Sequence, residues 1–257
     1  MNKLSAAIIT YNEEKNIERC ITSLLPVADE IVVLDSFSED KTELICRNLG
    51  VKFHQHAFDG HIQQKNRALT YTKYDWVLSL DADEALSSEL RESILRLKSA
   101  SDLSDAYAFN RLNYYCGKSL KHTWQPDINI RLWRKGAGQW EGKNPHDTFI
   151  LKPEKTLTRL KGNLLHYSFE TIEQHLNQIN KFSSIAADDL FQKEKKSGLK
   201  LYFSPVTAFV KQYFLKAGFL DGYYGFVVAV NSAFAKFSKY SKLKAAHKTN
   251  KSRRNHE

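Results

Sequence analysis

The first 100 residues alternate between short apolar runs and amphipathic segments, and this alternation restricts the possible folds more than any other feature. Apolar runs of four to seven residues predict buried strands, and apolar residues spaced three or four apart predict helices. The expected strands are 4–10, 30–34, 51–54 and 76–80, and the expected helices are 13–25, 39–49, 61–71 and 88–99. Strands that alternate with helices in this way are typical of a mostly parallel sheet with helices on both faces.

The pattern changes after residue 106. Residues 106–115 and 128–134 are expected to be antiparallel strands, whereas 171–195 and 206–237 are expected to be mostly helical, with Pro205 starting the last section. The sequence therefore predicts an α/β half that binds nucleotides, then a mixed region, then a helical end.

Charge is distributed unevenly over the 257 residues. Lys and Arg number 38 against 29 Asp and Glu, but residues 1–100 carry a net charge of −4 and residues 101–257 one of +13. Such an asymmetry indicates an anionic partner for the second half only. With 42% hydrophobic and 26% charged residues, the composition excludes a disordered or fibrous chain.

The cysteines point to a reducing compartment, and the hydropathy pattern argues against a membrane span. Cys20, Cys46 and Cys116 are odd in number and fit no disulfide or zinc spacing. The longest apolar stretch without a charge near the basic end, 222–235, has 14 residues, which is short of the ~18 that a spanning helix needs. We expect neither a secretory signal nor a membrane span.

An acidic turn follows the fourth expected strand, where the sequence reads Asp81-Ala82-Asp83-Glu84. Ligands of open α/β sheets bind beyond the carboxyl ends of the strands. Two carboxylates there are suited to Mg²⁺ or Mn²⁺, which takes one or two carboxylates together with substrate phosphates. The alternative is that this turn simply caps the following helix.

Four motifs occur in order and together resemble the family 2 glycosyltransferases of the GT-A fold. They read AAIITYNEEKNIERCITSL, VVLDSFSEDKT, QQKNRAL and WVLSLDADE. Later segments, RLWRKG, WEG followed by HD, LLHYS and GFLDGYYGF, are similar to the subgroup that acts in lipopolysaccharide core biosynthesis. The resemblance implies a GT-A type, Rossmann-like sheet with a helical, basic C-terminal extension.

The resemblance also implies roles for individual residues. Those expected to bind the nucleotide sugar are Thr10, Tyr11, Glu13, Asp35, Lys65, Asn66 and Asp81. Asp83 is expected to bind the metal directly, and His166 resembles the histidine that some GT-A enzymes add as a further metal ligand. The chain departs from the family after its second strand, because Asp35-Ser36-Phe37 lacks the usual second Asp and the Gly.

An inverting sugar transfer needs a general base that takes the proton of the acceptor hydroxyl. The two candidates are Asp147 and Glu141, and the HD pair of the resembling subgroup favours Asp147. Trp140 and Trp124 are candidates either for stacking on a sugar ring or for the core.

Aromatic residues alternate with lysines from residue 201 to 237, and the last 22 residues contain eight Lys or Arg and one Glu. This pattern is typical of an interfacial contact with an anionic membrane. The alternative is a pair of core helices followed by a disordered, solubilising tail. The sequence contains no recognised nucleic-acid motif, so no nucleic-acid partner is expected.

The resemblance thus implies a metal-dependent inverting glycosyltransferase, peripheral on the inner face of the cytoplasmic membrane. It would move a hexose from a nucleotide-diphosphate sugar to a lipid-linked saccharide such as lipopolysaccharide core. The expected regions are 1–170 for the GT-A domain (1–100 for the donor, 101–170 for the acceptor), 171–240 for a membrane-associating helical region, and 241–257 for a disordered tail. Alternatives are transfer to another cell-surface glycan, a nucleotidyltransferase, or a non-catalytic binding protein with the same fold.

Overall fold

The computed structural model describes residues 2–143 and 146–254. The chain forms two compact units. The first unit comprises Met1–Leu112 and Pro126–Tyr167, and the second comprises Asn113–Gln125 and Ser168–Glu257. A short internal segment therefore belongs with the C-terminal helices, which the sequence did not indicate.

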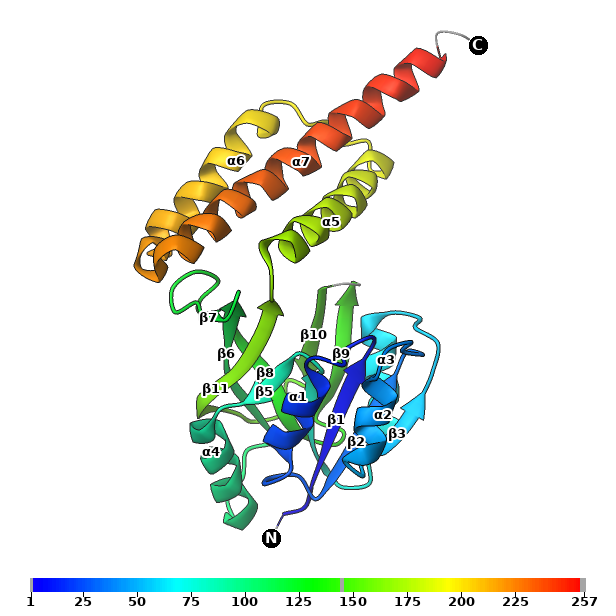
Figure 1. The fold of residues 1–257 in the computed structure, drawn as a ribbon, viewed down its shortest axis with the longest axis vertical. Helices are drawn as coiled ribbons and strands as arrows, with labels where there is room; N and C mark the ends of the chain where they lie inside the picture. Colours follow the sequence, from blue (N-terminus) through cyan, green and yellow to red (C-terminus); the bar gives the residue numbers. More distant parts are fainter. Residues whose placement is uncertain (1, 144–145, 255–257) are drawn as a thin grey trace. The chain divides into compact units, whose positions relative to one another are not determined.

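The first unit contains a parallel sheet in the order β3-β2-β1-β4 (Figure 1). Its strands are β1 (Leu4–Thr10), β2 (Glu30–Asp35), β3 (Lys52–Gln55) and β4 (Trp76–Asp81). The helices between and after them are α1 (Ile17–Leu24), α2 (Thr42–Asn48), α3 (His61–Thr70) and α4 (Ser88–Ser99). Every strand and helix expected in the first 100 residues is present, which confirms the predicted fold class.

Antiparallel strands extend this sheet beyond β4, in the order β8-β6-β11-β5. These strands are β8 (Ile128–Arg134), β6 (Ala106–Tyr115), β11 (Leu157–Phe169) and β5 (Glu84–Leu86), with β7 (Lys118–Ser119) paired to β6. A separate hairpin consists of β9 (Gly138–Lys143) and β10 (His146–Leu151). β5 and β9 to β11 were not predicted, because their polar and apolar residues follow no clear period of two.

Side chains of β1 alternate between two cores, as the pleat of a strand requires. Leu4, Ala6 and Ile8 pack with buried residues of α1, α2 and α4 on one face. Ala7 packs on the other face with α3 and the β9–β10 hairpin. Because both faces are covered, the parallel strands β1, β2 and β4 are mostly apolar and buried, whereas the edge strand β3 is not.

The second unit is built from α5 (Ile172–Gln192), α6 (Lys200–Val210), η1 (Lys211–Leu215), η2 (Gly218–Asp221) and α7 (Gly222–Arg254). α5 begins with a reciprocal capping box between Thr171 and Gln174. Two expectations differ from the structure: Pro205 lies inside α6, and α7 continues to Arg254, so residues 241–254 are helical. Residues 255–257 of the expected tail lie outside the described part. No helix among the described residues is long and apolar enough to cross a membrane.

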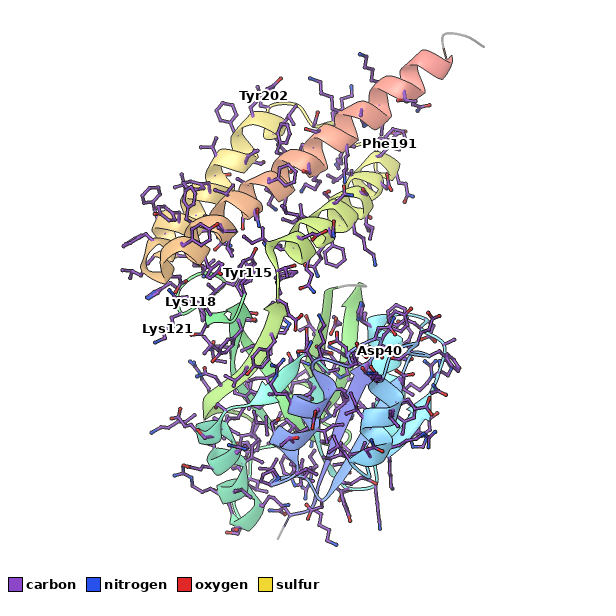
Figure 2. All side chains as sticks on the ribbon, viewed as in Figure 1. Asp40, Tyr115, Lys118, Lys121, Phe191 and Tyr202 are labelled. Carbon is purple, nitrogen blue, oxygen red and sulfur yellow. The ribbon has the colours of Figure 1, made fainter. Side chains whose placement is uncertain are left out.

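A buried polar cluster lies in the second unit around His175 (Figure 2 labels Tyr115). The Tyr115 hydroxyl lies 3.1 Å from His175 Nδ1, and Asn231 Nδ2 lies 3.0 Å from the same nitrogen. Phe169 stacks on the imidazole at 4.5 Å between ring centroids. Burial lowers the pKa of His175 to about 4, since the charged imidazolium would lose its hydration.

We expect the stability of the protein to fall as the pH decreases from about 6.5 to about 4. In this range the unfolded chain takes up a proton at His175, whereas the folded chain does not, so protonation favours unfolding by up to about 3 kcal/mol. Urea unfolding of wild type and His175→Phe at pH 7, 5.5 and 4.5 measures this, because the variant lacks the titrating group. Equal pH dependence of the two proteins would contradict the expectation.

Candidate active site

The acidic turn lies at the carboxyl end of β4, next to the carboxyl end of β1. Asp81 is the last residue of β4, and Glu84 begins β5. The following helix, α4, is capped by Ser87, whose hydroxyl accepts a hydrogen bond from the backbone N–H of Leu90 at 3.2 Å. The interpretation of the turn as a helix cap is therefore wrong, and its carboxylates have other partners.

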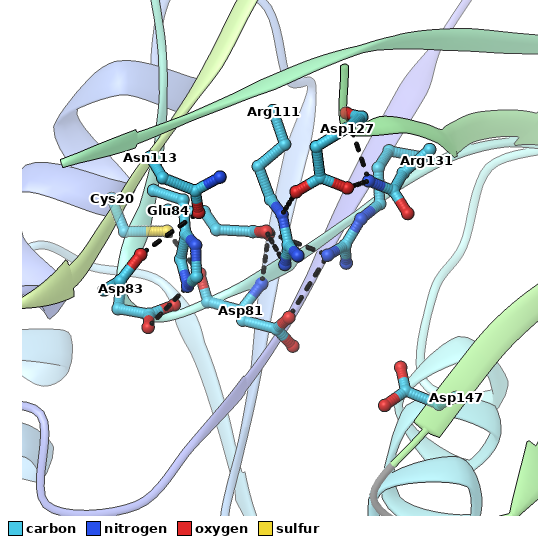
Figure 3. Close-up of polar contacts among 12 residues, drawn as sticks. Cys20, Asp81, Asp83, Glu84, Arg111, Asn113, Asp127, Arg131 and Asp147 are labelled. Carbon is cyan, nitrogen blue, oxygen red and sulfur yellow. Dashed lines mark hydrogen bonds and ion pairs between the residues drawn. The ribbon is translucent and has the colours of Figure 1, made fainter. Parts of the chain in front are cut away.

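Two buried cations, Lys65 and Arg131, hold the Asp81 carboxylate, and Figure 3 shows the contact with Arg131. Lys65 Nζ lies 3.0 Å from Oδ1, and Arg131 Nη2 lies 3.3 Å from Oδ2. Burial by itself raises the pKa of Asp81, but the charges of Lys65 and Arg131 outweigh it and hold that pKa well below its usual range. The residue is therefore ionised at any physiological pH.

Glu84 lies behind Asp81 and orients the turn. Its side chain is fully buried, accepts a hydrogen bond from the Asp81 backbone N–H at 2.9 Å, and lies 2.8 Å from Arg131 Nη2. Burial raises the pKa of Glu84, and the charge of Arg131 opposes this. Arg111 Nη1 lies 3.5 Å from Glu84 and its Nε donates to Asp127 at 2.8 Å, which extends the network.

Sequence reasoning assigned no role to Glu84, Arg131 or Arg111. Glu84 was visible only as part of the acidic turn, and Arg131 only as the first residue of RLWRKG. Arg131 comes from β8, which is adjacent to β4 in the sheet but about 50 residues later in the chain. Only the strand order brings the two residues together, and the sequence carries no direct signal for this.

Some buried polar atoms of the site have no hydrogen-bond partner within the described residues. They are Thr10 Oγ1, Arg131 Nε, Arg131 Nη1 and Trp140 Nε1. Thr10 lies at the end of β1 and is 5% exposed, and Arg131 is 3% exposed. Leaving such groups unpaired costs about 1–3 kcal/mol each, so their arrangement favours a site that a polar ligand completes.

Asp83 and His166 form the second pair at this end of the sheet. His166 lies on β11 directly opposite Glu84 of β5, and its Nε2 is 3.2 Å from Asp83 Oδ2. The backbone of Asp83 is also held, because its carbonyl accepts a hydrogen bond from the Tyr167 N–H at 2.9 Å. Burial lowers the pKa of His166, but the charge and the hydrogen bond of Asp83, together with the charge of Glu84, outweigh it, and the net shift of the pKa is upward.

Asp147 and Glu141 lie on neighbouring strands but on opposite faces of the β9–β10 hairpin. Asp147 pairs with Gly142, and Glu141 pairs with Thr148 in the next register position. Asp147 Oδ2 accepts from Lys65 Nζ at 2.7 Å, so Lys65 bridges Asp147 and Asp81. Glu141 is exposed and accepts from Gln139 at 2.8 Å.

The ring of Trp140 packs against Lys65, which bridges Asp81 and Asp147. Trp140 is buried, on the same face of the hairpin as Asp147, and its ring lies 4.4 Å from Lys65 Nζ. Asn66 exchanges two hydrogen bonds with the Trp140 backbone, at 2.9 and 3.1 Å, and so ties α3 to β9. Trp140 is thus a core residue, as one of its two interpretations predicted, and Trp124 belongs to the second unit.

The remaining residues expected to bind the donor differ in solvent exposure and in hydrogen-bond partners. Tyr11 is 55% exposed. Asp35 is completely buried and accepts hydrogen bonds from the Ser38 N–H at 2.8 Å, the Ser38 hydroxyl, and Gln55 Nε2 at 3.3 Å. The Glu13 carboxylate accepts from Asn16 Nδ2 at 2.7 Å. Asp35 and Glu13 therefore order the loops around the end of β1, while Tyr11 is presented to solvent.

An α/β sheet with ionised carboxylates and buried cations at the carboxyl ends of its strands has the architecture of a nucleotide-binding enzyme. The chain belongs to glycosyl transferase family 2, whose model matches residues 5–154. It is a glycosyltransferase.

Relatives are similar over nearly the full chain. An uncharacterised glycosyltransferase of Rickettsia typhi is 34% identical over 95% of this chain and 87% of its own length. A lipopolysaccharide core biosynthesis glycosyltransferase of Rhizobium meliloti is 31% identical over 95% of this chain and 93% of its own length. Among solved structures, glucosyl-3-phosphoglycerate synthase of Mycobacterium tuberculosis, in complex with Mn²⁺, UDP and phosphoglyceric acid, matches 44% of this chain and 43% of its own with 23% identity and a TM-score of 0.35.

Removing Arg131 is expected to destabilise the fold more than removing an exposed arginine. Arg131→Met leaves the buried Glu84 carboxylate with only the more distant Arg111, and breaking a buried pair costs about 3–5 kcal/mol. Adding Glu84→Gln should recover much of this loss, because the buried charge is removed too. Urea unfolding of the single and double variants measures the recovery.

The matched control is Arg96→Met on α4, where Arg96 pairs with Glu92 at 3.5 Å and both side chains are exposed. Its cost should be less than about 1 kcal/mol. If Arg131→Met costs no more than Arg96→Met, the network does not have the structural importance argued here.

Proposed function

We propose that the protein is a metal-dependent inverting glycosyltransferase that moves a hexose from a nucleotide-diphosphate sugar to a lipid-linked saccharide such as lipopolysaccharide core. The observation that carries this proposal is the bridge from Asp81 through Lys65 to Asp147, with Asp83 beside it. It brings donor-side and acceptor-side carboxylates to one end of the sheet. The 31% identity to a lipopolysaccharide core glycosyltransferase supports the acceptor class.

The donor's nucleotide is assigned to the ends of β1 and β2, within residues 1–100. Tyr11 presents an exposed ring for stacking on a base, and the unpaired Thr10 hydroxyl can bond the nucleotide. Glu13 and Asp35 order the loops at these strand ends, and Asn66 holds α3 against β9. Lys65 and Arg131 place two positive charges near the expected diphosphate, where charge-assisted hydrogen bonds are strong.

The pair Asp83–His166 fits a divalent cation. A carboxylate oxygen and an imidazole nitrogen lie 3.2 Å apart, and both are acceptable ligands for Mn²⁺, whereas Mg²⁺ prefers the carboxylate. Within the described residues no three His, Cys, Asp or Glu are grouped to hold a metal. When bound, Mg²⁺ or Mn²⁺ would neutralise charge on the departing diphosphate. Asp81, held by two cations, positions the turn that carries Asp83.

Asp147 is assigned as the general base. As the acceptor oxygen bonds to the anomeric carbon, Asp147 takes the hydroxyl proton, and the bond from that carbon to the diphosphate breaks with its electrons on the leaving oxygen. Lys65 holds Asp147 at 2.7 Å and so sets the direction of its carboxylate. Glu141 faces the other side of the hairpin, away from Lys65, which favours Asp147 over Glu141.

The acceptor is assigned to residues 101–170, and the second unit to the membrane. We place the enzyme on the inner face of the cytoplasmic membrane, peripheral to it, with its basic C-terminal helices against anionic lipid. The net charge of +13 on residues 101–257 supports an anionic partner for this part of the chain. A lipid-linked acceptor would be presented at that same surface.

Asp83→Asn is expected to abolish metal-dependent donor use. Protein is incubated with UDP-, GDP-, ADP- and dTDP-sugars with and without Mn²⁺ or Mg²⁺, and thermal shift and slow donor hydrolysis are measured. Wild type should show a thermal shift and hydrolysis with one of these donors, and only when the metal is present. Hydrolysis should fall about a hundredfold or more in Asp83→Asn.

The control is Asp75→Asn, an exposed residue just before the opposite end of β4, which should behave like wild type. No donor response in wild type, even with acceptor lipids present, would leave a binding protein as the better explanation. An equal loss in both variants would place the metal elsewhere.

Asp147→Asn should lower transfer by a factor of roughly 10²–10⁴, because the acceptor proton loses its base. Donor binding, measured by thermal shift with metal, should persist, since Asp147 is not assigned to the donor. Glu141→Gln provides the matched comparison on the same hairpin and should retain transfer. Loss of transfer in Glu141→Gln with transfer retained in Asp147→Asn would assign the base to Glu141.

A further inference from the structure

The GFLDGYYGF segment forms the turn between the helices α6 and α7. The Asp221 carboxylate accepts hydrogen bonds from three consecutive backbone N–H groups, those of Lys121, His122 and Thr123, at 2.9, 3.1 and 2.7 Å. A side chain on Gly225 would meet the Gly218 carbonyl oxygen at 1.9 Å, so only glycine fits there. Asp221 and the glycines therefore have structural roles. Nothing in the turn requires the aromatic and aliphatic residues between them to be exposed.

The apolar residues of the turn are nevertheless exposed. Phe219 and Leu220 on η2 and Leu215 on η1 are 48%, 61% and 77% exposed. Large apolar side chains that occur singly on a surface need no explanation, whereas contiguous ones indicate an interaction site.

An apolar stripe runs along α6 from this turn. Its members are three or four residues apart and so lie on one face of the helix, and all are 39% to 72% exposed. They are Leu199, Tyr202, Phe203, Val206 and Val210. Figure 2 shows Tyr202 projecting from α6.

A second stripe with the same spacing runs along α7. Its exposed members are Tyr223, Phe226, Val230, Phe234 and Phe237. Phe226 contacts Phe209 and Tyr213 of the preceding helical segment, at 6.1 and 5.7 Å between ring centroids. The α7 stripe therefore borders α6 at Phe226. We call the two stripes and the exposed apolar residues of the turn together the apolar face.

The chain segment that carries the apolar face has charges of almost entirely one sign. Residues 195–254 contain thirteen Lys and Arg and a single acidic residue, Asp221. Asp221 is buried, and its carboxylate accepts hydrogen bonds from the backbone of the loop at residues 121–123. Lys200 and Lys211 are exposed and lie on the side of the α6 stripe, about 100° around the helix from its centre. Lys118 and Lys121, also exposed, come from the loop that Asp221 holds against the turn (Figure 2).

We propose that the apolar face lies flat in the interface of an anionic lipid bilayer, with α6 and α7 parallel to the membrane plane. Aromatic and branched side chains enter the boundary between headgroups and acyl chains, and the flanking lysines contact anionic headgroups. This inference rests on the proposed function, in which the acceptor is lipid-linked, and specifies which surface meets the membrane and how.

The charge pattern favours lipid over a second copy of the chain. Two such faces brought together would juxtapose lysines with lysines and no carboxylates, which costs free energy at each close pair. An anionic bilayer offers an apolar boundary region for the two stripes and negatively charged headgroups for the lysines. The aromatic residues also distinguish this surface from one that binds a polyanion by charge alone.

The test is co-sedimentation of the full chain with vesicles of phosphatidylcholine alone and of phosphatidylcholine mixed with phosphatidylglycerol, without donor. Leu220→Glu, in the turn, and Leu199→Glu, at the far end of the α6 stripe, should each weaken binding to the mixed vesicles about tenfold or more. Leu44→Glu is the matched control on α2 of the first unit, since Leu44 is 56% exposed and Leu220 61%. It should bind like wild type.

The electrostatic part is tested separately. Lys200→Ala and Lys211→Ala should each weaken binding to the mixed vesicles roughly fivefold. Neither should change binding to phosphatidylcholine alone, and salt should weaken only the binding to the mixed vesicles.

Each alternative outcome overturns the proposal. If only Leu220→Glu weakens binding, the turn inserts end-on and the helices do not lie flat. If wild type ignores vesicles and sediments as a dimer that Leu220→Glu dissociates, the face binds a second copy. If the lysine variants lose binding and the leucine variants do not, the surface recognises charge alone.

The outcomes for lipid binding and for catalysis are distinguishable. Asp83→Asn should bind vesicles like wild type, because Asp83 belongs to the first unit. Vesicle binding without any metal-dependent donor use would contradict the proposed function and leave the lipid surface standing. Metal-dependent donor use without vesicle binding would contradict the lipid surface and leave the proposed donor chemistry standing.

Discussion

The ion pairs around Asp81 are the interaction on which the rest of the site depends. Lys65 of α3 and Arg131 of β8 both contact its carboxylate, and Arg131 also pairs with the buried Glu84. Charges so deeply buried are tolerated only when each has a partner. The network therefore joins a helix, a parallel strand and an antiparallel strand, and it orients the turn that carries Asp83. The same lysine contacts Asp147 on the β9–β10 hairpin, so one cation positions the two carboxylates that we propose for the donor and acceptor sides.

The second unit follows a different design. Its interior is held by packing around His175 and by Asp221, which satisfies three backbone N–H groups of a neighbouring loop. Its outer surface combines exposed aromatic residues with lysines and has no exposed carboxylate from residue 195 to 254. For an enzyme whose acceptor is lipid-linked, such a surface would bring the protein to its substrate, while the ionised site in the first unit carries out the transfer.

The parallel half of the fold could be predicted from the sequence because its strands are apolar on both faces and its helices have one apolar face. The short strand β5, which pairs with the distant β11, and the β9–β10 hairpin could not, since their residues follow no clear period. Asp81, Asp83 and Asp147 were identified from motifs. Glu84 and Arg131 were not assigned a role, because the contact between them arises from strand order. The motif did not indicate that Asp35 is buried and accepts hydrogen bonds from the Ser38 N–H and hydroxyl, and its binding of the nucleotide stays a prediction.

The most direct test of the central claim is a Mn²⁺ titration of the purified protein, followed by electron paramagnetic resonance of free Mn²⁺, with and without a nucleoside diphosphate. We expect a single Mn²⁺ to bind weakly alone and much more tightly with the diphosphate. Asp83→Asn should remove this binding, and Asp75→Asn should preserve it. Mn²⁺ binding that is indifferent to the nucleotide, or that persists unchanged in Asp83→Asn, would contradict the claim that the end of β4 holds the donor through a metal ion.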